Sequence, residues 1–111
     1  MSATPLLAQK CRPLPAGTPP LPPGEIASLL KLLPGWTLAG GAIEKAYRFG
    51  DYYETIAFVN AIALVAHRED HHPDMSVGYN LCRVAFSTHS TGGISMNDFI
   101  CAAKIEAMAA M

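Results

Sequence analysis

The chain has 111 residues, of which 50% are hydrophobic and 15% are charged, and its formal net charge is −1. This length fits one domain with a modest core, and the apolar excess suggests that a second copy, in a homodimer or homotetramer, covers part of the surface. No stretch is densely basic, so direct binding to nucleic acid, which requires a cationic surface, is not expected.

The N-terminal part is rich in proline, with seven of the nine prolines in the first 23 residues. Proline fixes φ and removes a backbone donor, so residues 1–23 are predicted to form an extended tail or strap, to which we assign no function. The folded domain is expected to span residues 24–111. It begins with a short helix over residues 25–33, which Pro34 ends.

A first hairpin follows this helix. Two strands, at residues 36–39 and 42–49, flank Gly40 and Gly41, and this glycine pair indicates a two-residue turn because glycine tolerates positive φ. On the apolar face of the second strand, Lys45 is the exception.

A long helix is predicted over residues 52–70. Asp51 and Glu54 resemble a capping box at its start, and Pro73 disfavours helical geometry in the residue before it. The helical period predicts a single apolar face, made of Ile56, Val59, Ala63 and Ala66.

A second hairpin and a last helix complete the chain. The strands are predicted at residues 75–79 and 81–89, with a turn around Asn80, and Ser95 with Asp98 forms a second capping box. The order α-β-β-α-β-β-α predicts an α+β, two-layer fold, with one four-stranded antiparallel sheet and helices packed on one face.

The cysteines and the hydropathy pattern favour a cytoplasmic protein. Cys11, Cys82 and Cys101 are odd in number and widely spaced, which suits a reducing compartment and small apolar packing residues. The apolar stretch at residues 57–66 is too short to cross a bilayer, and no basic residue precedes Leu6 as a secretory signal would require.

All four histidines fall inside a 23-residue window. His67 and His71 are four residues apart, so both could lie on one face at the end of the long helix. Pro73 should force His72 into extended geometry, and His89 would end the last strand. A helix end and a strand end can meet at one rim of a two-layer domain, where a shallow cleft could form.

Three explanations of this histidine cluster compete. His67 and His71 have the spacing of a metal-ligand pair with His89 as a third ligand, although no cysteine has matching spacing and the residue directly after His67 is not the glutamate that a zincin motif requires. The histidines could instead be a polar rim without chemistry. The third explanation is acid–base catalysis, because imidazole both donates and accepts protons near neutral pH.

The spacing of these residues resembles that of the pterin-4a-carbinolamine dehydratase family. The shared pattern is a polar residue four positions before His-His-Pro, then an aromatic residue, a histidine and an aspartate. These positions are filled here by His67, His71-His72-Pro73, Tyr79, His89 and Asp98. The resemblance runs from about Leu33 to the C-terminus, and Tyr79 is expected to pack in the core.

The resemblance implies a hydro-lyase that dehydrates a 4a-hydroxytetrahydropterin to a quinonoid dihydropterin, in tetrahydrobiopterin regeneration, without metal or other cofactor. It implies that His71, His72 and His89 are catalytic. Substrate-binding positions would be His67, Asp70, Ser87, Thr88, Ser90 and Asp98. His67 stands where relatives often have glutamate, and Met75 where many have tryptophan. The alternative is a non-catalytic pterin-binding, dimerisation or coactivator module.

Overall fold

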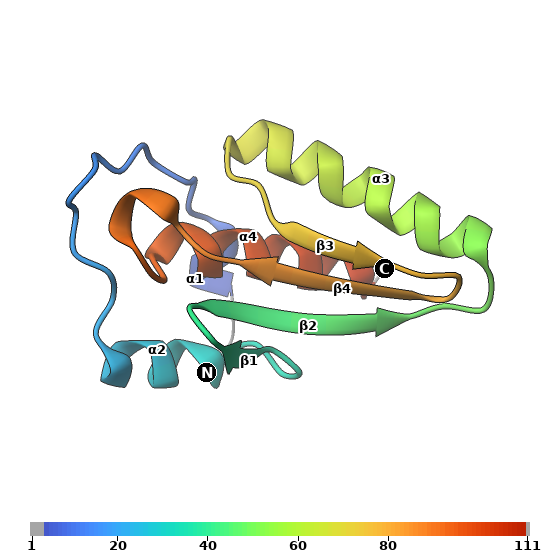
Figure 1. Cartoon of the computed structure of the whole chain (residues 1–111), viewed down its shortest axis with the longest axis horizontal. Helices are drawn as coiled ribbons and strands as arrows, with labels where there is room; N and C mark the ends of the chain where they lie inside the picture. The colour runs from blue at the N-terminus through green and yellow to red at the C-terminus, as the bar shows by residue number, and fades with distance from the viewer. Residues whose placement is uncertain (1–3, 111) are drawn as a thin grey trace.

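The protein, described here by a computed structural model of residues 4–110, consists of one curved sheet with two long helices across one of its faces (Figure 1). Its elements in chain order are α1 (Thr4–Leu7), α2 (Pro23–Leu30), β1 (Thr37–Ala39), β2 (Ala42–Arg48), α3 (Tyr52–Glu69), β3 (Asp74–Val77), β4 (Leu81–Phe86), the 3₁₀ turn η1 (His89–Thr91) and α4 (Met96–Ala109).

The four strands form one antiparallel sheet in the order β1-β2-β4-β3. The predicted α+β class, with one four-stranded antiparallel sheet and helices on one side, is confirmed. The predicted element order corresponds to α2 through α4, and the structure adds α1 and η1. None of the helices in residues 4–110 is long and apolar enough to span a membrane.

The first hairpin forms as its glycines indicate. Ala39 pairs with Ala42, and Gly40 between them has φ of 61°, in the left-handed region that glycine adopts without steric cost. Lys45 lies on the core side of β2, as the strand pattern predicted, and its Nζ binds the carboxylate of Glu106 from α4 at 2.8 Å. The charged residue on the apolar face is therefore neutralised by the helix that covers that face.

The core lies between this face of the sheet and helices α3 and α4. Ile43 of β2 pairs with Phe86 of β4, and both side chains are fully buried against Ile62 of α3 and Phe99 of α4. Residues on the opposite face include Glu44 and Arg83, which form an exposed ion pair. One face of the sheet is thus buried, as expected of a two-layer fold.

The predicted apolar face of α3 is displaced by one residue. Ala66 is buried as predicted, but Ala63 is exposed and Ile56 and Val59 are only partly covered. The buried residues of the helix are Thr55, Phe58, Ile62, Ala66 and Glu69. Two of these are polar, so a pattern of apolar residues alone could not find the buried face.

The second hairpin is shorter than predicted. β4 ends at Phe86 rather than His89, and His89 begins the 3₁₀ turn η1. Only one isolated bridge, between Thr88 and Gly93, continues the pairing among the described residues. Tyr79 lies at the hairpin turn and is 65% exposed, stacked on Tyr52, so the expectation that it packs in the core is wrong.

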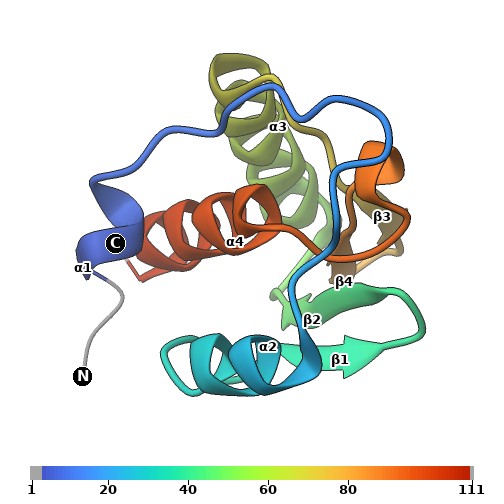
Figure 2. The same ribbon diagram turned by 90° about the vertical axis from the view of Figure 1, so that its left-hand side faces the viewer.

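The chain between α1 and α2 crosses over α4 (Figure 2). Leu6 of α1 is 3% exposed and belongs to the core cluster. Residues 8–22, here named the strap, contain no regular helix or strand and are attached to the rest of the chain by backbone hydrogen bonds. These include Gly17 N–H to Ser90 O and Leu21 N–H to Ile94 O.

Candidate active site

The end of α3 determines where His71 lies. Asp70 has φ of 51°, and the N–H groups of Asp70 and His71 both donate to the carbonyl of Ala66. This left-handed residue ends the helix and reverses the chain direction. The expectation that His67 and His71 share one helix face is therefore wrong, because His67 is exposed on the last turn of α3 while His71 lies beyond it and turns inward.

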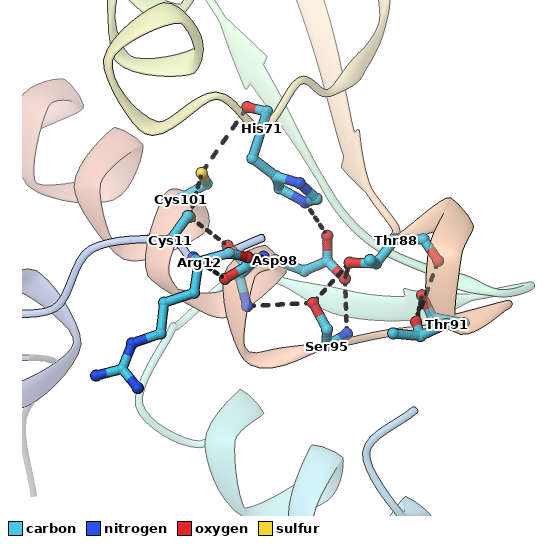
Figure 3. A network of polar contacts seen from close by, with 10 residues as sticks. Cys11, Arg12, His71, Thr88, Thr91, Ser95, Asp98 and Cys101 are labelled. Atoms are coloured by element: carbon cyan, nitrogen blue, oxygen red, sulfur yellow. Dashed lines mark hydrogen bonds and ion pairs between the residues drawn. The ribbon is translucent and has the colours of Figure 1, made fainter. Parts of the chain in front are cut away.

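The imidazole of His71 is held between a carboxylate and an aromatic ring. Its Nε2 lies 2.5 Å from Oδ1 of Asp98, and its ring stacks on Phe86 with centroids 5.9 Å apart and an interplanar angle of 13°. The side chain of His71 is 13% exposed and that of Asp98 is fully buried. Figure 3 shows the ring pointing from the segment after α3 toward the first turn of α4.

Asp98 is both a helix cap and the partner of His71. Its Oδ2 accepts hydrogen bonds from the backbone N–H of Ser95 and from Oγ1 of Thr88, each at 2.8 Å. The Ser95–Asp98 capping box predicted from the sequence is confirmed. The two roles use different oxygens, so capping the helix leaves Oδ1 free to bind the imidazole.

The hydrogen bonds around Asp98 have one consistent direction. Because the single proton of Thr88 Oγ1 is donated to Asp98, the 2.6 Å contact between Thr88 and Ser95 requires Ser95 Oγ to donate to Thr88. Ser95 Oγ in turn accepts from the N–H of Asn97. Two donors, the N–H of Ser95 and the hydroxyl of Thr88, therefore converge on Oδ2 of the buried carboxylate, and Oδ1 faces the imidazole.

An ionised Asp98 can only accept a hydrogen bond, so Nε2 of His71 must carry the proton of their contact. In the neutral ring Nδ1 is then an acceptor. If Nδ1 takes up a proton, the resulting imidazolium is adjacent to a buried negative charge that stabilises it. The arrangement can therefore accept a proton and later return it.

The structure brings together three of the nine predicted site residues: His71, Thr88 and Asp98. The side chains of the other six make no hydrogen bond among residues 4–110, and all but the half-buried Ser90 are exposed. These six are His67, Asp70, His72, Ser87, His89 and Ser90. Four of them are direct neighbours of the network in the sequence, since Asp70 and His72 flank His71, and Ser87 and His89 flank Thr88.

Two cavities lie near this end of the molecule. The larger, of about 340 Å³, separates the strap from the start of α4, and the smaller, of about 130 Å³, lies beside Cys11 and Glu69. The three predicted catalytic histidines line neither. Among the described residues, no three histidine, cysteine or acidic side chains are grouped in a way that could hold a metal ion.

The sequence indicates Ser95 only as a helix cap, and it does not indicate Phe86 as a site residue. Ser95 contributes both its N–H and its hydroxyl to the network, and it is 4% exposed. Phe86 supplies the surface on which the imidazole stacks. The capping-box motif makes Ser95 recognisable in the sequence. The stacking of Phe86 on His71 depends on the turn after α3, so no pattern near Phe86 in the sequence indicates it.

Glu69 attaches the strap close to His71. Its carboxylate accepts from the N–H of Cys11 and from Nζ of Lys104, each at 2.8 Å. Burial alone would raise the pKa of Glu69, but the hydrogen bonds from Lys104 and Cys11 outweigh burial, so the pKa lies below its usual value. The C-terminal end of α3 is thereby tied to both the strap and α4.

Comparison with known proteins gives a consistent result. The family model described as pterin 4 alpha carbinolamine dehydratase matches residues 19–108, so the match begins earlier than the resemblance seen from Leu33 onward. A protein of Nitrosomonas europaea is 57% identical over 102 residues, covering 91% of this chain and 90% of its own length. One of Bdellovibrio bacteriovorus is 55% identical over 113 residues, covering 98% and 92%. Both carry the words pterin-4-alpha-carbinolamine dehydratase in their names.

Solved structures agree with the fold. A Brucella melitensis protein described as a transcriptional coactivator/pterin dehydratase superposes with a TM-score of 0.78 at 33% identity, covering 81% of this chain and 98% of its own. A pterin dehydratase-like protein described as a RuBisCO assembly factor of the alpha-carboxysome superposes with a TM-score of 0.57 at 23% identity, covering 68% and 89%. The second likeness concerns the fold alone.

Proposed function

The chain belongs to the pterin 4α-carbinolamine dehydratase family, and we propose that it catalyses the loss of water from a 4a-hydroxytetrahydropterin. The single observation that carries this proposal is the contact between His71 Nε2 and Asp98 Oδ1, at 2.5 Å and out of bulk water. It supplies a proton acceptor with a fixed tautomer, as the reaction requires.

The reaction needs two proton transfers and no redox change. The substrate carries a hydroxyl group on a carbon next to a ring nitrogen. When the hydroxyl receives a proton and leaves as water, a ring nitrogen loses a proton, and the products are water and a quinonoid dihydropterin. Each well-placed proton transfer is worth roughly 10²–10⁴-fold in rate.

We assign the two transfers to His71 and His89, with His72 orienting the pterin ring. His71 accepts a proton at Nδ1, and the Asp98 carboxylate stabilises the imidazolium that forms. Asp98 also binds Thr88, the residue before His89, so one carboxylate connects the two segments that carry all three histidines. Both segments lie at the end of the sheet where α4 begins (Figure 1).

The test is a stopped-flow measurement of 4a-carbinolamine breakdown by the wild type and by His71→Gln and His89→Ala. We expect the wild type to exceed the spontaneous rate, and each substitution to remove most of this acceleration, roughly 10²-fold or more. Glu106→Gln is the matched control, because it alters a carboxylate of the same helix at the end away from Asp98.

The outcomes separate the enzyme from the alternative module. A wild type no faster than the spontaneous reaction, but able to bind the pterin in a fluorescence titration, would contradict catalysis and support a pterin-binding module. A wild type that is fast together with an equally fast His71→Gln would retain the enzyme and refute the role assigned to His71. Tetrahydrobiopterin regeneration is the physiological setting that we propose for this activity.

A further inference from the structure

Two of the three cysteines lie in direct contact. Sγ of Cys11, on the strap, is 3.5 Å from Sγ of Cys101, on α4, although the two residues are 90 positions apart. Cys101 is fully buried and Cys11 is partly exposed, and both are free thiols. Cys82, the third, is fully buried in β4. Figure 3 shows the Cys11–Cys101 pair directly beside His71.

The backbone on both sides of Cys11 is fixed against the rest of the chain. Its own N–H donates to Glu69, and the next residue, Arg12, exchanges two hydrogen bonds with the side chain of Asn97. The two sulfur atoms are therefore kept close together. A disulfide bond is about 2.05 Å long, so the atoms need to approach by only about 1.5 Å to form one.

The two thiols differ in their access to a reagent. Cys11 and Arg12 line the cavity of about 130 Å³ that lies beside Glu69 and Asp70. Cys101 has no exposure, and contact with the Cys11 thiol together with burial raises its pKa. A reagent from solution can thus reach Cys11 first, and Cys101 can react only through Cys11.

We propose that Cys11 and Cys101 form a redox-active dithiol, which a small-molecule disulfide oxidises to an intramolecular disulfide that fastens the strap to α4. The Cys11 thiolate attacks one sulfur of the reagent, and a mixed disulfide forms as one thiolate leaves. Cys101 gives up its proton and attacks Cys11 Sγ, which releases the second thiolate. The two protein thiols lose two electrons and two protons, and the reagent disulfide becomes two thiols.

The bond would hold the strap in place directly behind the candidate active site. Sγ of Cys101 also lies 3.9 Å from the backbone carbonyl of His71, so the sulfur that becomes oxidised contacts the residue whose ring binds Asp98. A link between residues 90 positions apart restricts the unfolded chain strongly, and it should raise Tm by more than about 5 °C.

The test uses the full-length protein and oxidised glutathione, followed by denaturation, alkylation and intact mass measurement. In the wild type we expect alkylatable cysteines to fall from three to one, with a peptide linking Cys11 to Cys101 in the unreduced digest. Cys82→Ala should lose both of its remaining thiols in the same way. These measurements require no pterin and no activity, so they stand apart from the proposed function.

Two variants resolve the order of the steps. Cys101→Ala should stop at a stable mixed disulfide between Cys11 and glutathione, and Cys11→Ala should leave both remaining thiols unmodified. A linkage through Cys82, a dimer joined through Cys11, or a wild type that stops at the mixed disulfide or does not react would each overturn the proposal. The wild-type peptide map decides the question even if a variant fails to fold.

Discussion

Helix α4 carries two carboxylates that differ in burial and in the kind of side chain that they bind. Asp98, in its first turn, is fully buried and binds His71, Thr88 and Ser95 from three separate segments. Glu106, near the other end, has a side chain that is 30% exposed, and it binds Lys45, Tyr47 and Trp36. Asp98 thus binds an imidazole, a side chain that can both donate and accept a proton, and none of these partners of Glu106 is an imidazole.

The cluster around Asp98 is a candidate catalytic site, whereas the cluster around Glu106, here named the tether, only holds α4 against the sheet. Burial, together with the adjacent Glu106, raises the pKa of Tyr47 well above its usual value. The phenol therefore keeps its proton and donates a hydrogen bond of 2.6 Å to Glu106. The cluster around Glu106 is therefore chemically inert at neutral pH and joins α4 to β2. The cluster around Asp98, by contrast, leaves Nδ1 of His71 available to exchange a proton.

The largest effect is expected from Asp98→Asn. The amide keeps the volume but loses the charge, and its NH₂ group faces donors that require an acceptor. We expect the dehydration rate to fall by about 10²–10⁴-fold and the free energy of unfolding to fall by about 1–3 kcal/mol. Stopped-flow kinetics and urea denaturation measure the two effects. A variant that retains the wild-type rate would show that Asp98 is only a cap.

Thr88→Val should have an intermediate effect. The substitution removes one donor to Asp98 and leaves the hydroxyl of Ser95 without its acceptor, while the shape of the side chain is nearly unchanged. We expect a loss of about 1–2 kcal/mol in unfolding free energy and a roughly tenfold slower reaction, of the order of one lost hydrogen bond to a charged group. Thr88→Ser restores the hydroxyl and should recover most of both.

Much of the fold could be predicted from local signals. The Ser95–Asp98 capping box and the Gly40 turn are confirmed because each depends on residues within a few positions of one another. The buried face of α3 was misplaced because two of its members are polar. Thr55 can be buried because its hydroxyl donates a hydrogen bond to the carbonyl of Tyr79 at 2.8 Å. Glu69 can be buried because its carboxylate accepts hydrogen bonds from Cys11 and Lys104.

The candidate site depended more on tertiary structure. His71 and Asp98 are 27 positions apart, and only the resemblance to a family suggested that they act together. No local pattern predicts that Asp70 adopts a left-handed conformation and so separates His67 from His71. The prolines predict an extended tail or strap over residues 1–23. This prediction misses the helix α1 and gives no partner for the segment, so the Cys11–Cys101 contact was not predicted.

Glu106→Gln tests whether the cluster around Glu106 contributes to stability and not to catalysis. The variant weakens the bond to Lys45 but keeps an oxygen that can accept from Tyr47. We expect a loss of about 1 kcal/mol in unfolding free energy and a dehydration rate within about twofold of the wild type. Denaturation and the stopped-flow assay measure both. A large loss of activity here would mean that the two ends of α4 are coupled, and the contrast between site and tether would fail.

The smallest effect is the acid dependence of stability. Burial alone would raise the pKa of Glu106, but hydrogen bonds from Lys45 and Tyr47 outweigh burial, so the folded-state pKa lies below the unfolded value. The stabilisation is then complete above the unfolded glutamate pKa of about 4.3, and it is lost as the pH falls through the lower folded value.

Urea denaturation between about pH 6 and pH 3 measures this acid dependence. Glutamine does not titrate, so Glu106→Gln should lose less stability than the wild type over that range. The gap between the two proteins should be largest at neutral pH and should close in acid. A gap that stays constant with pH would show that the charge of Glu106 contributes nothing, and that the tether consists only of its neutral hydrogen bonds and packing.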